Sequence, residues 1–228
     1  NIEAIIDNRE EVDSKLVYEV EKNNIKIFKG YTVTDTFGYK RINRISIKQL
    51  SKDGQKVIGS RINLSCDCLG VSGGWTPAVH LFTQSGGKLK FRDEDQVFVP
   101  NLHPSDHLSI GSCNGDFTLD EILKNTPKSL KEFLDIKNTE YESLEIISST
   151  NKSKRNIWLL PSDKVIGKTK SFVDYQNDAT AKDIKLALRE GFRSIEHVKR
   201  YTTTGMGTDQ GKLGNMHALG IISETAGA

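Results

Sequence analysis

The sequence has little cysteine, no long apolar run and almost no net charge. Its three cysteines in 228 residues cannot form a fully paired disulfide framework, so a reducing, cytoplasmic setting fits best. The uninterrupted apolar runs are far shorter than the roughly 20 residues of a transmembrane helix, which predicts no membrane span. Because 32 basic residues nearly balance 30 acidic ones, we expect no nucleic-acid partner.

Residue groups typical of metal or nucleophilic chemistry are also lacking. Cys66 and Cys68 are separated by one residue, whereas the usual redox and zinc pairs are separated by two. His103 and His107 have i, i+4 spacing, but the proline between them predicts a loop and not a metal site. Ser72 lies in Val-Ser-Gly-Gly, which is not the Gly-x-Ser-x-Gly of a nucleophile elbow. We therefore predict no catalytic and no metal-ligating residue in this chain.

The first hundred residues predict an α/β arrangement. A strand, a helix and a second strand form a β-α-β step, and an antiparallel meander with a hairpin signal at Asp53-Gly54 follows. Further on, two segments have the pattern of a strand that ends in glycines. The predicted strands lie at 2–6, 24–28, 31–36, 41–50, 61–69, 96–99 and 108–115, and the helix lies at 12–23.

Asp7 follows the first predicted strand directly. A carboxylate in this place of a dinucleotide-binding β-α-β unit accepts hydrogen bonds from the adenosine ribose hydroxyls. The alternative interpretation is that Asp7 caps the helix that follows. Arg9 is a candidate phosphate ligand, and the competing interpretation is a surface ion pair of little energetic weight. Asp7 and Arg9 are thus the first candidate cofactor-binding residues.

Two glycine turns supply the other candidates. Ser72, Gly73 and Gly74 follow a predicted strand, and glycines there let the backbone approach a ligand closely. A tight βα turn with Trp75 in the core is the structural alternative. The turn that begins at Gly111-Ser112 has the same ambiguity. Since no Gly-x-Gly-x-x-Gly follows a strand, the pyrophosphate-binding unit of a dinucleotide domain is expected before Asn1, and the chain is expected to be a fragment.

The second half of the sequence predicts a helix, a connector and a compact helical module. Thr118 and Glu121 have capping-box spacing and open the first helix, whose apolar stripe is interrupted at Pro127. The polar stretch 135–155 is typical of a connector. From residue 168 short helices follow, the first opened by Thr180 with Asp183 and closed by Gly191. We expect the next helix to be capped by Ser194 and the last one to begin near residues 209–210.

A long and specific match identifies a family resemblance. The stretches Phe172–Ile184, Glu196–Thr203 and Gly205–Lys212 resemble the alpha subunit of heterotetrameric sarcosine oxidase. Ser72–Leu81 and Ser85–Lys88 are similar to the end of that subunit's pyridine nucleotide-disulfide oxidoreductase-like domain. The resemblance implies an incomplete Rossmann-like dinucleotide-binding domain at 1–117, a helix and connector at 118–167, and a small all-helical domain at 168–228.

The resemblance also implies the cofactors and partners. It implies a subunit that binds NAD and works with beta, gamma and delta subunits, with FAD and covalently attached FMN on the beta subunit, where sarcosine is oxidised. Oxygen would be the electron acceptor, and tetrahydrofolate would take the one-carbon unit. In related flavoproteins a Gly-Asp pair touches the dinucleotide, and the equivalent Gly111-Ser112 lacks that carboxylate.

The helical domain resembles the small domain that holds a 2Fe–2S cluster in related amine and opine oxidoreductases. The positions equivalent to the four cluster cysteines are Asp174, Gln176, Asp209 and Gly214, none of which is a thiolate. The resemblance therefore implies a domain without a cluster, retained as a scaffold. The alternative function is a non-catalytic scaffold or interaction subunit of a related amine or opine dehydrogenase complex.

Overall fold

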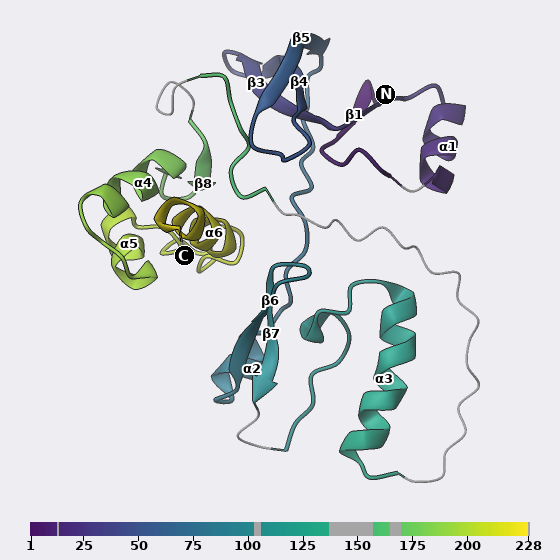
Figure 1. The fold of residues 1–228 in the computed structure, drawn as a ribbon, viewed down its shortest axis with the longest axis vertical. Coiled ribbons are helices and arrows are strands. Elements are labelled where there is room, and N and C mark those ends of the chain that lie inside the picture. Colours follow the sequence, from purple (N-terminus) through teal and green to yellow (C-terminus); the bar gives the residue numbers. More distant parts are fainter. Residues whose placement is uncertain (13, 103–105, 137–156, 165–169, 228) are drawn as a thin grey trace. The chain divides into compact units, whose positions relative to one another are not determined.

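The structure is a computed structural model, and it describes residues 1–12, 14–102, 106–136, 157–164 and 170–227 (Figure 1). The chain divides into two compact units, each discontinuous in sequence. The first contains residues 1–10, 25–68 and 157–228, and the second contains residues 11–24 and 69–156. The domain boundaries predicted at 117 and 167 stay a prediction.

The first unit begins with a two-stranded parallel sheet. Strand β1 (Ala4–Asp7) pairs with β2 (Lys26–Lys29), with Ile5 opposite Ile27 and Asp7 opposite Lys29. Helix α1 (Ser14–Lys22) lies between the two strands in sequence and groups with the second unit, where its Val17 is buried. The predicted β-α-β step is confirmed. Parallel strands occur almost only in larger sheets covered on both faces, and a pair of strands is a small part of such a sheet.

An antiparallel meander follows in the same unit. It consists of β3 (Tyr31–Gly38), β4 (Ile42–Leu50) and β5 (Val57–Ser65) in that order. Ile45, Ile47 and Leu50 of the central strand are buried. The prediction of a strand at 61–69 was wrong at both ends. The hairpin at Asp53-Gly54 brings Val57 opposite Leu50, so β5 begins earlier than predicted, and its pairing with β4 ends at Ser65, opposite Arg44.

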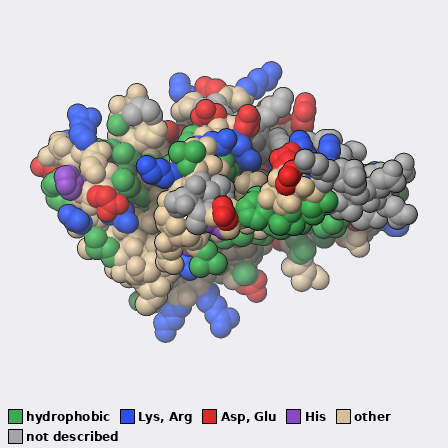
Figure 2. Space-filling model, turned by 90° about the horizontal axis from the view of Figure 1, so that it is seen from below, with side chains coloured by type: hydrophobic (Ala, Val, Ile, Leu, Met, Phe, Trp, Pro, Cys, Tyr) green, Lys and Arg blue, Asp and Glu red, His purple; other side chains and the backbone are tan. Residues whose placement is uncertain are grey.

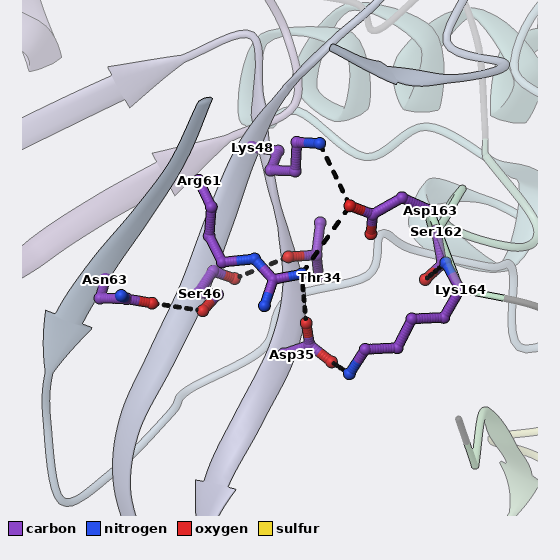
Figure 3. A network of polar contacts seen from close by, with 9 residues as sticks. All are labelled: Thr34, Asp35, Ser46, Lys48, Arg61, Asn63, Ser162, Asp163 and Lys164. Atoms are coloured by element: carbon purple, nitrogen blue, oxygen red, sulfur yellow. Dashed lines mark hydrogen bonds and ion pairs between the residues drawn. The ribbon is translucent and has the colours of Figure 1, made fainter. Parts of the chain in front are cut away.

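The segment 157–164 contacts the meander through a polar network, which Figure 3 shows. Asp163 accepts a hydrogen bond of 3.2 Å from the Lys48 ammonium, and Arg61 lies 3.8 Å from the same carboxylate. The buried carboxylate of Asp35 pairs with Lys164 and lies 3.3 Å from Arg61. This last contact is an ion pair without hydrogen-bond alignment.

The helical module occupies residues 170–227 of the first unit. It contains α4 (Ala181–Arg189), α5 (Ile195–Thr202) and α6 (Asn215–Ala226), together with a short pair of strands, β8 (Phe172–Asp174) and β9 (Ala179–Thr180). The strand pair is an addition to the predicted helices. One core cluster unites the module. Its buried members are Val173, Ala181, Ile184, Ala187, Leu188, Val198, Ala218, Ile221 and Ile222.

The ends of α4 follow the sequence signals, whereas Ser194 stands at the predicted N-cap of α5 without a side-chain hydrogen bond to the helix. Thr180 and Asp183 form the predicted capping box. After α4, Gly191 adopts a φ of +98° and donates to Leu188, and Phe192 donates to Ala187, which is the Schellman arrangement. The last helix begins at Asn215, later than predicted, because residues 209–214 form turns instead.

The segment before the module completes its core. Trp158 and Leu159 pack against the core cluster. A Cβ built at Gly220 would lie 2.1 Å from the Trp158 indole, so the absence of a side chain on α6 makes room for this ring. The prediction of a featureless connector up to about residue 155 falls mostly on residues 137–156, which lie outside the described residues.

The second unit contains a hairpin and a long helix. Helix α2 (His80–Gln84) precedes the antiparallel hairpin of β6 (Lys88–Arg92) and β7 (Val97–Leu102), and a short 3-10 helix, η1 (Gly111–Asn114), precedes α3 (Leu119–Phe133). The strand expected at 108–115 is absent. Ile110 is extended, with φ −132° and ψ 160°, but no described strand pairs with it, and the chain turns into η1.

Helix α3 is well formed but poorly covered. Thr118 and Glu121 form the predicted capping box, and Pro127 lies inside the helix, which continues to Phe133. None of its residues is buried within the described structure. Its apolar stripe is partly exposed, with Leu119 at 66% and Phe133 at 44%.

Two surface properties bear on the predicted partners. Among the described residues, no helix has both the length and the apolar character that crossing a bilayer requires. On the face shown in Figure 2, basic and acidic side chains are interspersed instead of gathering by sign. This mixture agrees with the balanced composition.

Candidate functional site

Asp7 is the last residue of β1, at the carboxyl end of the parallel strand pair. Its carboxylate closes a local loop with Arg9. Oδ1 accepts hydrogen bonds from the Arg9 backbone N–H at 2.9 Å and from Nε at 3.0 Å, and Oδ2 accepts one from Nη2 at 2.7 Å. The structure thus brings these two candidate residues together as a forked ion pair.

The ion pair with Arg9 determines the protonation state of the Asp7 carboxyl. Partial burial raises the pKa of the Asp7 carboxyl, but the hydrogen bonds and positive charge of Arg9 outweigh burial and lower that pKa overall. The carboxylate is therefore ionised at neutral pH and is an acceptor only. Each carboxylate oxygen accepts two hydrogen bonds, so Oδ2 retains capacity for a ribose hydroxyl beside Arg9.

The Arg9 guanidinium, a candidate phosphate ligand, is hydrogen-bonded to the Asp7 carboxylate. Two of its guanidinium nitrogens already donate to the carboxylate, and the side chain is 37% exposed. Its backbone carbonyl also accepts a hydrogen bond of 2.9 Å from Gly30, at the start of β3. Arg9 therefore holds the end of β1 in place and orients the neighbouring carboxylate.

The glycines at 73 and 74 lie in an exposed segment without regular secondary structure. This segment follows β5 after several residues and is not the tight turn of a strand end. Gly74 adopts a φ of +120°, and a Cβ there would meet nothing within 4 Å. Trp75 is 79% exposed, which contradicts the alternative interpretation of a tight βα turn with Trp75 in the core. Ser72, Gly73 and Gly74 thus offer accessible backbone and belong to the second unit, whereas Asp7 belongs to the first.

Gly111 and Ser112 open η1, next to the hairpin. Gly111 is buried with a φ of +66°, and Ser112 is exposed. Two backbone hydrogen bonds close this turn: Gly115 donates to Ser112 at 3.2 Å and Asp116 donates to Gly111 at 3.1 Å. We call residues 111–116 the η1 turn.

A side chain that the sequence did not single out fastens the η1 turn. Arg92, the last residue of β6, donates from Nη2 to the Gly115 carbonyl at 2.8 Å. The same guanidinium forms a fork with Asp95, with Nε 2.7 Å from Oδ1. The spacing of Arg92 and Asp95 across a hairpin tip was visible in the sequence. The contact with Gly115 was not, because 23 residues separate the two.

Three of the four positions that the resemblance equates with cluster cysteines, Asp174, Gln176 and Asp209, hold side chains that accept hydrogen bonds from backbone N–H groups. The Asp174 carboxylate, 6% exposed, accepts hydrogen bonds from Gln176 and Asn177 and one of 2.8 Å from the Gly205 backbone N–H. Gln176 Oε1 accepts from the backbone N–H and the hydroxyl of Thr208. Asp174 and Gln176 therefore tie the end of β8 to the loop 205–208.

The other two positions are equally unsuited to a cluster. Asp209 accepts hydrogen bonds from the backbone N–H groups of Gly211 and Leu213. A Cβ at Gly214 would lie 2.6 Å from the Val173 carbonyl oxygen, so no thiolate fits there without a backbone shift. Thiolates are what an iron–sulfur cluster requires, and these residues do not fit one.

Buried Asp174 is ionised despite its surroundings. Burial raises the pKa of its carboxyl, but the N–H groups of Gly205, Asn177 and Gln176 outweigh burial and lower that pKa overall. Hydrogen bonds to the charged form are the general cause of such a shift.

Comparison with known proteins first defines the class. Over 99% of this chain and 45% of the other, the structure resembles the crystal structure of L-proline dehydrogenase from P. horikoshii, with a TM-score of 0.54 and 18% sequence identity. At this identity the likeness concerns the fold alone, and it confirms the predicted α/β class.

Sequence comparison then shows which proteins the chain is similar to. Residues 168–228 match the family model of the sarcosine oxidase A3 domain. The chain is 28% identical to sarcosine oxidase subunit alpha of Corynebacterium sp. (strain P-1) and 30% identical to that of Rhizobium meliloti (strain 1021), over 98% and 95% of its length. The predicted resemblance to sarcosine oxidase alpha subunits is confirmed. The chain spans 24% and 21% of the lengths of these two relatives.

Proposed function

We propose that this chain is an inner portion of the alpha subunit of a sarcosine-oxidase-type flavoenzyme. The observation that carries the proposal is the similarity to such subunits over nearly the whole chain. In this proposal residues 1–117 are the later part of an NAD-binding domain, and residues 118–167 connect it to the helical domain at 168–228. The parallel pair β1–β2, too small to stand alone, supports a larger sheet of which it is a part.

Asp7 is the proposed ribose ligand of NAD. Its ionised carboxylate at the end of β1, oriented by Arg9, has the chemistry to accept a hydroxyl hydrogen bond. We assign Ser72, Gly73 and Gly74, and Gly111 with Ser112, to close approach of the dinucleotide by backbone. A carboxylate contact from position 112 is replaced by a serine hydroxyl, which donates as well as accepts.

The oxidation itself is proposed to occur outside this chain. A sarcosine oxidase converts sarcosine to glycine with oxygen as the acceptor and passes the one-carbon unit to tetrahydrofolate. We assign FAD and covalently bound FMN to a beta subunit and expect gamma and delta subunits to complete a heterotetramer. A cytoplasmic location fits the three free thiols Cys66, Cys68 and Cys113.

A second role belongs to the helical module. The hydrogen bonds of Asp174 and Gln176 join its loops where a related domain would hold a cluster. This observation favours a scaffold that packs against a neighbour and carries no redox centre. The same scaffold role would serve a related amine or opine dehydrogenase complex.

NAD titration tests the proposed nucleotide site. The protein is the alpha subunit that includes the predicted glycine-rich unit, and binding is followed calorimetrically. We expect saturable binding that Asp7→Ala weakens about tenfold, since one charge-assisted hydrogen bond contributes on the order of 1.5 kcal/mol. Asp67→Ala, at an exposed aspartate after β5, is the matched control and should bind like the parent. Absent binding, or equal affinity of the Asp7 variant, contradicts the assignment.

A further inference from the structure

The η1 turn is held from two sides by side chains that have no role in forming η1 itself. From the hairpin, Arg92 reaches the Gly115 carbonyl at 2.8 Å. From α3, Asn125 donates to the Asp116 carboxylate at 2.9 Å. The turn is therefore fixed in relation to two neighbouring elements of the same unit.

The contact between Arg92 and the η1 turn depends on a glycine. A Cβ at Gly115, whose φ is +84°, would lie 2.6 Å from the Arg92 guanidinium and 2.9 Å from Val99. Gly115 is buried, and Val99 is 3% exposed. Only a residue without a side chain permits this approach, and the left-handed backbone favours glycine as well.

Asp95 keeps the guanidinium in a single orientation. The fork between Arg92 and Asp95 uses Nε and Nη2, and Nη2 also serves Gly115. Planar bidentate pairing is a property of arginine and is not available to lysine. The geometry of the η1 turn thus depends on the identity of residue 92, and not on its charge alone.

We infer that Arg92 is a positioning residue for dinucleotide binding: with Asp95 it holds the η1 turn, in which Gly111 is buried, in the conformation that presents the exposed Ser112 to the cofactor. This role rests on the proposed function. A turn that is already in its binding conformation loses less conformational freedom when the ligand binds, and affinity rises accordingly. Arg92 itself need not touch the dinucleotide.

The test compares Arg92→Lys, Arg92→Ala and Asp95→Asn in the alpha subunit, with Lys90→Ala on the exposed side of the same strand as control. NAD affinity is measured by calorimetry. We expect both Arg92 variants to bind about tenfold more weakly and Asp95→Asn about threefold more weakly. The control should equal the parent. Arg92→Lys should not restore the NAD affinity of the parent. Lysine keeps the positive charge, but it cannot form the bidentate hydrogen bonds that Arg92 makes with Asp95.

Hydrogen exchange separates positioning from general destabilisation. The amides of Gly115 and Asp116 close the η1 turn, and they should exchange faster in Arg92→Lys while core amides of the hairpin and the helical module keep the parent's rates. Parent-like affinity of Arg92→Lys, or loosening that spreads to the whole hairpin, overturns the role of Arg92. Absence of NAD binding in the parent overturns the proposed function, and the positioning role with it.

Discussion

Helices α3 and α4 begin with the same local device and end in different environments. Each opens with a threonine and an acidic residue three positions later, and each forms a complete capping box. Helix α4 buries Ala181, Ile184, Ala187 and Leu188 in nine residues, whereas α3 buries none in fifteen. A capping box fixes where a helix starts, and it says nothing about what covers the helix.

The difference extends to the regions that contain the two helices. The helical module has one continuous core cluster of nine buried residues, to which Trp158 and Leu159 add. In the second unit the buried apolar side chains are few, and among the described residues they are Val17, Pro77, Phe82, Val97 and Val99. Most helical stability in proteins comes from packing of the apolar face. Stability in this chain should therefore be concentrated in the module.

Truncation of a core side chain gives the largest expected effect. Ile184→Ala on α4 removes a fully buried side chain, so we expect a loss of roughly 2–5 kcal/mol in the free energy of unfolding. Leu130→Ala on α3, at a side chain 37% exposed, should cost less than about 1 kcal/mol. Denaturant unfolding followed by fluorescence of Trp158 measures the first, and far-ultraviolet circular dichroism measures the second. Equal losses would remove the contrast between the two regions.

Removal of the Asp174 carboxylate tests the hydrogen bonds that connect the end of β8 to the loop 205–208. Asp174→Ala leaves the Gly205 N–H and its neighbours without their acceptor in a buried place, and each such group costs about 1–3 kcal/mol. Asp174→Asn keeps one carbonyl oxygen and should lose less than the alanine variant. Thr203→Ala, at an exposed hydroxyl in the same loop, is the control. If asparagine and alanine destabilise equally, the hydrogen bonds are not the cause.

The same carboxylate predicts a pH dependence. Because the pKa of Asp174 is lower in the folded protein than its ordinary value of 3.8, its stabilising contribution is complete above that value. The contribution is lost as the pH falls through the lower, folded pKa. Unfolding midpoints measured between about pH 6 and pH 3 should therefore fall more steeply for the parent than for Asp174→Asn. Parallel profiles of the two proteins would contradict the assigned charge.

Local signals in the sequence were sufficient for much of the fold. The capping boxes, the Gly191 helix end and the alternation of the meander each depend on residues close in sequence, and all were predicted. The errors at 61–69 and 108–115 have one cause. A strand exists only where a partner strand pairs with it, and partners are set by tertiary structure.

The candidate site was predictable to a lesser degree. The place of Asp7 at a strand end follows from the strand pattern. Its engagement with Arg9 depends on side-chain geometry that spacing alone leaves open, and both interpretations of Arg9 were reasonable. Arg92 and Gly115 are far apart in sequence and meet because the hairpin and η1 pack together. No local sequence pattern predicts the contact between Arg92 and Gly115.

The smallest expected effect concerns the ion pairs of segment 157–164. Asp163→Asn removes the partner of Lys48 and Arg61 at a side chain that is 40% exposed, where water and salt screen the attraction. The unfolding midpoint should fall by no more than about 2 °C in dilute buffer, and the difference from the parent should vanish at 1 M salt, where the screening length is about 3 Å. Asp67→Asn at an exposed aspartate serves as control. A large, salt-independent loss would instead show that segment 157–164 is held mainly by these charges. The packing of Trp158 over Gly220 would then contribute less than its close contact indicates.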